Sequence, residues 1–223
     1  MKSYVRNIAI VLIFSFAYTL LQAQEKKDTT ADPTGYLSMG ARNFISVFTT
    51  NGKRFVGTGA GGQFALRIAE NFNSHWFADW VTSNIDNLAQ RNDFHSGFSM
   101  MPHVFSPRMG ASHTSLYPLA GFCIDYTKFT ITSGKNISAG PNYVERYSFA
   151  AQAGCGATFP VSDRLDFSLE AHYMLHIGTD VDIATSGNEV LLIKKGGTNI
   201  EGHFAVSLSM DFKLFRLWKK RAS

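Results

Sequence analysis

Histidines and carboxylates are the residues of this sequence that could do chemistry, because they bind metal ions and transfer protons. His172 and His176 are four residues apart, a metal-binding spacing on a helix. On a strand the same spacing separates them by about 13 Å, too far to share one ion. His172, His203 and Glu170 could approach one another across neighbouring strands, but most histidines inside a barrel only fill hydrogen-bonding positions. We therefore predict no catalytic, metal-binding or cofactor-binding residue.

A glycine-rich segment, residues 56–62, could be mistaken for a phosphate-binding loop. It is not followed by the Lys-Ser or Lys-Thr pair of such a loop, and it lies in a predicted strand. Gly57, Gly59 and Gly61 fall on one face of that strand. We interpret them as small residues that make room for larger ones across a barrel interior.

The two cysteines, Cys123 and Cys155, are too few for a disulfide scaffold. By strand alternation, Cys123 shares a face with Asp125, whereas Cys155 shares a face with Phe149. Side chains on opposite faces cannot form a disulfide. We therefore predict two free thiols.

The N-terminal residues predict export. Lys2 and Arg6 precede an uncharged apolar stretch over residues 8–21, and Ala23 offers a small residue for cleavage. The stretch is shorter than the ~20 residues that a membrane-spanning helix needs, so a signal peptide over residues 1–23 is favoured over an uncleaved anchor. No cysteine lies near the cleavage point, so lipoprotein processing is not expected.

Composition excludes several classes of protein. The chain of 223 residues has nineteen phenylalanines and one long apolar run, so it is neither a disordered chain nor a helical membrane protein. Removing Lys2 and Arg6 leaves 19 basic against 17 acidic residues, or a formal charge of +2. No basic block interleaved with aromatics follows, so nucleic acid is not an expected partner.

Alternation of apolar and polar residues dominates the chain from about residue 37, which is typical of strands with two unlike faces. The clearest alternations cover residues 147–159, 165–177 and 204–214, each long enough to cross a membrane. Weaker strands are predicted over residues 37–49, 54–69, 74–84, 93–106 and 115–130. Eight strands predict an all-β fold, an eight-stranded antiparallel up-and-down transmembrane β-barrel over residues 37–218. A flexible polar lead-in (24–36) precedes it and a basic tail (219–223) follows.

The connections between the predicted strands differ in length on the two sides of the barrel. The longest, residues 131–143 and 178–198, fall on the same side, as the outer loops of bacterial outer-membrane barrels do. The short Asn51-Gly52 hairpin turn on that side departs from the pattern. The longer connection over residues 107–114, on the other side, also departs from it.

An eight-stranded barrel has an interior filled by side chains, and closure satisfies every backbone group in lipid. The polar faces of the predicted strands would then point inward, and their mixed charges suggest a neutralising network. The residues predicted to face the interior are Arg67, Asp79, Asp125, Gln152, Glu170, His172, Glu201, His203, Asp211 and Lys213.

Aromatic residues on the apolar faces lie towards strand ends, as interfacial girdles do. They are Trp76, Tyr126, Tyr147, Phe159, Phe167 and Phe212. Alternation identifies a face but not its direction, so a soluble barrel with an apolar interior would show the same pattern. Strand length, export and loop lengths favour the membrane.

Three features resemble the small outer-membrane β-barrel proteins of Bacteroidetes, and more broadly the OmpA/OmpX-type eight-stranded barrel. They are the signal end Leu20-Leu21-Gln22-Ala23-Gln24, the glycine-rich strand over 56–62, and a final amphipathic strand that ends in aromatics. The resemblance covers about residues 37 to 218. It implies a location in the cell outer membrane, insertion by the barrel-assembly machinery, and outer-membrane lipid and lipopolysaccharide as partners. Phe215 and Trp218 are followed by five further residues, whereas such barrels usually finish on an aromatic.

We predict a non-enzymatic outer-membrane barrel with a structural, adhesive or assembly-partner role. Its outer loops, residues 131–143 and 178–198, would contact a protein partner. One alternative is a lipid A-modifying barrel enzyme, although His113-Thr114-Ser115 followed by Leu116 matches the His-x-Ser-Asn signature of the deacylase type poorly. Another alternative is a soluble periplasmic barrel that binds an apolar ligand.

Overall fold

The computed structural model describes residues 34–50, 53–69, 71–103, 114–132, 136–137, 141–162, 164–186 and 189–218. The predicted signal peptide, the Asn51-Gly52 turn, His113 and the basic tail lie outside these ranges. Among the described residues, no helix has the length and apolar character needed to cross a membrane.

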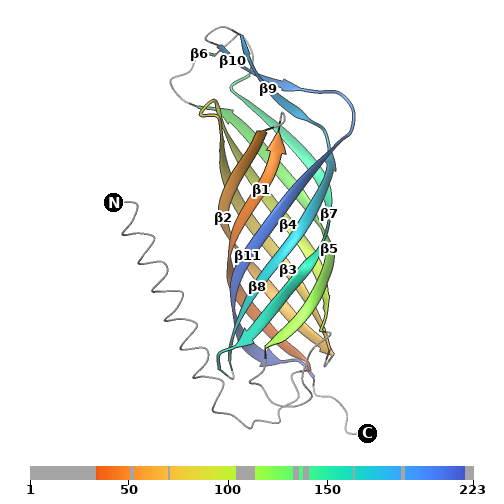
Figure 1. Cartoon of the computed structure of the whole chain (residues 1–223). Coiled ribbons are helices and arrows are strands. Elements are labelled where there is room, and N and C mark those ends of the chain that lie inside the picture. Colours follow the sequence, from red (N-terminus) through yellow and green to blue (C-terminus); the bar gives the residue numbers. More distant parts are fainter. Residues whose placement is uncertain are drawn as a thin grey trace, which may run out of the picture.

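Eight antiparallel strands close into a barrel, with neighbours in the order in which they follow along the chain (Figure 1). They are β1 (Tyr36–Thr50), β2 (Lys53–Ala69), β3 (Phe72–Ile85), β4 (Ala89–Pro102), β5 (Ser115–Ile131), β7 (Tyr143–Pro160), β8 (Leu165–Gly178) and β11 (Asn199–Arg216). The last strand, β11, pairs with β1 and closes the barrel. The predicted all-β, eight-stranded up-and-down architecture is confirmed.

Three short strands beyond one end of the barrel were not predicted. They are β6 (Asn136–Ile137), β9 (Val181–Ser186) and β10 (Glu189–Lys194), which form a small sheet in the order β6-β10-β9 (Figure 1). The β9–β10 hairpin occupies the middle of the segment predicted as one long loop, residues 178–198. We call this end of the barrel the outer end, and the end that holds residues 34 and 218 the periplasmic end.

Strand β4 begins four residues earlier than the sequence predicted. Asp86 and Asn87 have positive φ angles of 52° and 57°, and the Leu88 amide donates to the Ile85 carbonyl. This tight turn lets Ala89 pair directly with Ile85. Arg91 and Asp93, which follow the turn, are buried. In the sequence, Arg91 lies in the segment predicted to connect two strands.

The barrel buries most of its polar side chains inside and exposes many large apolar side chains outside. In β3, for example, His75 and Asp79 are buried, whereas Trp76 and Trp80 are 58% and 52% exposed. The six predicted girdle aromatics lie on outward faces, since none of them is buried and each alternates with inward residues. Alternation could not show which face points outward. In the structure the apolar face does, as in membrane barrels.

Candidate functional site: a paired lumen and a capped outer end

All ten residues predicted to face the interior do so. Seven of them are buried: Asp79, Asp125, Gln152, Glu170, His172, His203 and Asp211. The other three, Arg67, Glu201 and Lys213, bond to interior groups near the two ends of the barrel. The lumen therefore holds polar side chains towards both ends, together with a buried apolar cluster that includes Phe44, Phe77 and Met174.

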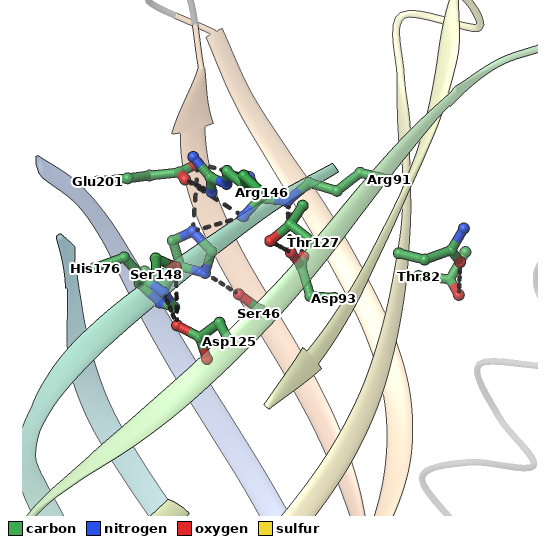
Figure 2. A network of polar contacts seen from close by, with 12 residues as sticks. Ser46, Thr82, Arg91, Asp93, Asp125, Thr127, Arg146, Ser148, His176 and Glu201 are labelled. Carbon is green, nitrogen blue, oxygen red and sulfur yellow. Dashed lines mark hydrogen bonds and ion pairs between the residues drawn. The ribbon is translucent and has the colours of Figure 1, made fainter. Parts of the chain in front are cut away.

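The outermost part of this interior is a network centred on Arg91 (Figure 2). Its Nε donates to both oxygens of Asp93, at 2.9 and 2.8 Å, and its Nη1 donates to Glu201 at 2.6 Å. Arg146 also contacts Glu201, and Thr127 donates to Asp93 at 2.6 Å. Two guanidinium groups thus neutralise two carboxylates, which suits a fixed structural network better than a reactive centre.

Histidines occupy the middle of the lumen in an arrangement that differs from the predicted one. His176 Nδ1 lies 2.5 Å from Asp125 Oδ2, and the rings of His176 and His203 are 4.1 Å apart between centroids. His172 does not join them through strand pairing, because the register of β8 and β11 places it opposite Ala205. Within the described ranges, no cluster of three or more His, Cys, Asp or Glu side chains could hold a metal ion.

A second paired network lies nearer the periplasmic end. Arg42 Nε is 3.3 Å from Asp79 Oδ1, and Arg42 Nη2 is 3.8 Å from Glu170 Oε2. His75 Nδ1 lies 3.4 Å from the same Glu170 carboxylate, and Gln63 donates to both oxygens of Asp211 at 2.8 Å. Arg42 thus lies between two carboxylates, and Gln63 supplies neutral donors to a third.

The glycines on the inward face of β2 make room for the neighbouring strand β3, rather than for large side chains across the lumen as predicted. A Cβ atom added at Gly59 would collide with the Trp80 backbone carbonyl, and one added at Gly61 would collide with Asp79. By contrast, a Cβ at the outward Gly62 would meet only Gly40 O, at 3.6 Å. Gly59 and Gly61 thus allow β2 and β3 to approach closely around the buried Asp79.

A serine–histidine pair at the periplasmic end is the arrangement closest to a hydrolase site. His103 Nδ1 lies 2.9 Å from Ser115 Oγ, and His103 Nε2 lies 3.0 Å from Arg67 Nη1. A guanidinium can only donate, so Nε2 accepts and the proton of the neutral ring is on Nδ1. Nδ1–H then donates to Ser115, so His103 cannot take the proton of the Ser115 hydroxyl as a general base would.

An apolar cluster closes the outer end of the lumen above the Arg91 network. The barrel contributes Phe48, Phe129 and other apolar side chains to it, and the β9–β10 hairpin contributes Val181, Val190 and Leu192, all buried. Arg91 packs under this cap, with its Cζ 4.3 Å from the centroid of the Phe48 ring. The hairpin is therefore docked onto the barrel mouth.

The outward surface changes from apolar to polar within one step of strand register. An aromatic row crosses β3, β4, β5 and β7 as paired residues: Trp80, Phe94, Tyr126 and Tyr147. The next outward row towards the outer end is entirely polar: Thr82, Asn92, Lys128 and Glu145. This boundary is where an interface between hydrocarbon and polar headgroups would lie.

Both cysteines are free, and they lie on opposite faces as predicted. Cys123 is buried in the lumen, whereas Cys155 is exposed on the outer wall. The Cys123 thiol donates to Asp125 Oδ1 at 3.2 Å. It therefore belongs to the polar interior.

Several interior residues were missed by the sequence analysis, among them Arg42, Arg91, His95 and Arg146, all buried. Phe44 and Phe48 share the inward face of β1 with Arg42, so that face has no uniform polarity in the sequence. Strand alternation could have identified these residues, because every second residue of a strand such as β1 must point inward.

No family model and no curated protein matches this chain. Among solved structures, Neisserial surface protein A covers 80% of this chain and 97% of its own, with 11% identity and a TM-score of 0.56. Ail, the attachment invasion locus protein of Yersinia pestis, covers 81% of this chain and 99% of its own, with 12% identity and a TM-score of 0.48. OprG of Pseudomonas aeruginosa covers 84% of this chain and 99% of its own, with 12% identity and a TM-score of 0.45.

The Bacteroidetes resemblance stays a prediction, since none of these structures tests it. The closed strand order and the similarity to Neisserial surface protein A together show that this chain has the fold of the small eight-stranded outer-membrane barrels.

Proposed function

We propose that this chain is a non-enzymatic outer-membrane barrel whose function is carried by its outer end rather than by its lumen. The observation that carries the proposal is the capped and filled interior. The Arg91 network and the apolar cap block the outer mouth. An eight-stranded barrel of this kind serves as a support for the surface that it displays.

The outward face supports residence in a bilayer. On β5 the outward side chains from Leu116 to Ile124 are apolar or small, and polar ones begin at Tyr126 and Lys128. At about 3.3 Å per residue, the segment from Leu116 to Tyr126 spans roughly 33 Å. A tilt of about 40° reduces this to roughly 25 Å, the height of the apolar band in outer-membrane barrels.

The soluble alternative requires the opposite distribution of side chains. A periplasmic barrel that binds an apolar ligand needs an apolar cavity and a polar outer wall. Here Phe122, Ile124 and Phe149 are at least half exposed on the outer wall, while the middle of the lumen contains Asp125 and His176. Exposing such a wall to water would favour aggregation.

The small sheet of β6, β10 and β9 is the part of the described chain that extends furthest from the barrel (Figure 1). Its buried face caps the lumen, so its other face and its edge strand β9 remain for a partner. An adhesive or assembly role for this chain rests on the position of this sheet.

Membrane residence and a closed lumen are tested together with purified protein. The folded chain should migrate differently on gels before and after heating, and it should give no conductance steps in planar lipid bilayers. Recovery in the soluble periplasm, or regular porin-like steps, would contradict the proposal.

The role of the outer end is tested by replacing residues 181–194 with a short Gly-Ser turn. We expect the barrel to insert normally, while adhesion of cells that display it falls to the level of cells without it. Adhesion unchanged by the replacement would place the function elsewhere.

The absence of enzymatic activity is part of the proposal and has its own test. Mass spectrometry of lipid A from a deletion strain and its parent should show identical acylation and phosphorylation. A lost or added acyl chain would favour the lipid A-modifying alternative instead.

A further inference from the structure

A compact group of tyrosines and lysines lies on the outer wall, directly above the apolar band. It comprises Tyr126 and Lys128 of β5, Tyr143, Glu145 and Tyr147 of β7, and Lys194 of β10. We call this group the rim patch. Its members face away from the lumen, so the interior networks do not use them.

Strand register places the rim patch at the depth of lipid headgroups. Outward pairs along β5 and β7 run from Ile124 with Phe149, to Tyr126 with Tyr147, and then to Lys128 with Glu145. The first pair is apolar, the second is amphipathic and the third is charged. Tyrosine and lysine in this order are typical of the boundary between hydrocarbon and headgroups.

The rim patch carries two ammonium groups near one carboxylate. Lys128 Nζ lies 3.8 Å from Glu145 Oε1, and both side chains are more than a third exposed. Lys194 Nζ bonds only to the Glu145 backbone carbonyl, at 3.2 Å, among the described residues. One positive charge is therefore left over, and an anion is the partner that complements it.

The rings beside these lysines are exposed and ordered by contact with their neighbours. Lys128 Nζ lies 4.4 Å from the centroid of the Tyr143 ring, and the Tyr126 and Tyr147 rings are 5.3 Å apart. Tyr143 and Tyr147 are 51% and 69% exposed. Exposed tyrosine rings offer flat apolar surface and a hydroxyl, which suit the face and the hydroxyl groups of a sugar.

We infer that the rim patch binds the phosphorylated glucosamine headgroup of lipid A in the outer leaflet. Lys128 and Lys194 would bind a phosphate, and Tyr143 and Tyr147 would pack against a sugar ring. Acyl chains would then lie along Phe149 and Ile124 below. The inference rests on the proposed outer-membrane location, and it names a specific lipid and the residues that select it.

The test compares two pairs of lysines at the same end of the barrel. K128A/K194A removes the charges of the rim patch. K53A/K195A removes two exposed lysines that already pair with Asp86 and Asp182. Binding of bisphosphorylated lipid A to each folded full chain in detergent is measured by native mass spectrometry, with dephosphorylated lipid A and phosphatidylglycerol as comparison lipids.

We expect K128A/K194A to weaken lipid A binding by about tenfold or more, and K53A/K195A to change it by less than about threefold. Intact protein should bind lipid A more tightly than either comparison lipid. Equal losses in the two variants, or equal affinity for phosphatidylglycerol, would mean unspecific attraction to anionic lipid and would overturn the inference. Failure of the proposed location is recognised separately, as loss of heat-modifiable migration or absence from the outer membrane.

Discussion

Arg91 illustrates how single residues hold the interior together. Its side chain is 1% exposed, yet it contacts Asp93, Glu201 and the face of the Phe48 ring. A buried guanidinium is tolerated because carboxylates, a ring nitrogen of His203 and an aromatic face surround it. Removing it would leave two carboxylates with too few donors.

Replacing Arg91 by Met tests how much this network contributes to the stability of the barrel. We expect the free energy of unfolding, measured by urea titration in lipid vesicles, to fall by about 3–5 kcal/mol, because carboxylates are left buried without their partner. K53M breaks the exposed Lys53–Asp86 pair and should cost less than about 1 kcal/mol. Equal costs for the two variants would show that the interior network does not stabilise the barrel.

A glycine pair in β2 provides a second test at this scale. G59A places a methyl group against the Trp80 carbonyl, whereas G62A makes only an ordinary van der Waals contact with Gly40. We expect G59A to lower the free energy of unfolding by about 1–3 kcal/mol and G62A to change it by less than about 0.5 kcal/mol. If the two variants unfolded alike, the close approach of β2 and β3 would not constrain position 59.

The two thiols should differ in reactivity because they face different surroundings. In the folded barrel, a lipid-soluble maleimide should label Cys155 and leave Cys123 unlabelled until the protein is unfolded. The mass of the alkylated protein gives the number of labels. Labelling that requires prior reduction would show a disulfide and contradict the assignment of free thiols.

Among the elements, the β9–β10 hairpin has two faces with different roles. Leu192 is 6% exposed and belongs to the apolar cap, whereas its neighbour Ile193 is 44% exposed. Alternation along β10 therefore decides which residues close the lumen and which are available to a partner.

L192D should undock the hairpin without unfolding the barrel, because an unpaired carboxylate is costly in the apolar cap. We expect protease added to intact cells to cut near residues 181–194 much faster in L192D than in the parent. I193D introduces the same charge on the exposed face and should be cut at the parental rate. Equal cutting of both variants would contradict the docked cap.

At the scale of the whole molecule, the barrel reverses the usual arrangement of a water-soluble protein. The barrel strands direct their buried charged and polar side chains to the lumen, beside a buried apolar cluster that includes Phe44, Phe77 and Met174, and they direct large apolar side chains outward. Closure pairs the edges of all eight strands. Closure satisfies the backbone hydrogen bonds in hydrocarbon, and the apolar outward side chains suit that surrounding.

A lysine placed at two depths on β5 tests this orientation. Ala120 and Thr130 both point outward, but Ala120 lies within the apolar band and Thr130 lies beyond Lys128. We expect A120K to destabilise the barrel by about 2–4 kcal/mol in vesicles and T130K by about 0–1 kcal/mol. A similar cost at both depths would argue against a bilayer around β5.

The alternation of β7, β8 and β11 made these strands predictable. Their faces differ throughout, because one side meets polar interior groups and the other meets an apolar surrounding. The cap strands were not predictable, since β9 and β10 are only six residues long and alternate over too few positions. The start of β4 was missed because Arg91 points into the lumen but is a charged residue close to a turn, which is typical of a loop.

The sequence by itself determined that the chain forms strands, how many strands there are approximately, which polar residues share a face, and that the two cysteines lie on opposite faces. These follow from period two, which is a local property of the chain. The tertiary structure alone decided which face points to the lumen, how the charges pair and what closes the outer mouth. Arg91 and Glu201 are 110 residues apart in the chain, and only closure of the barrel brings such groups together.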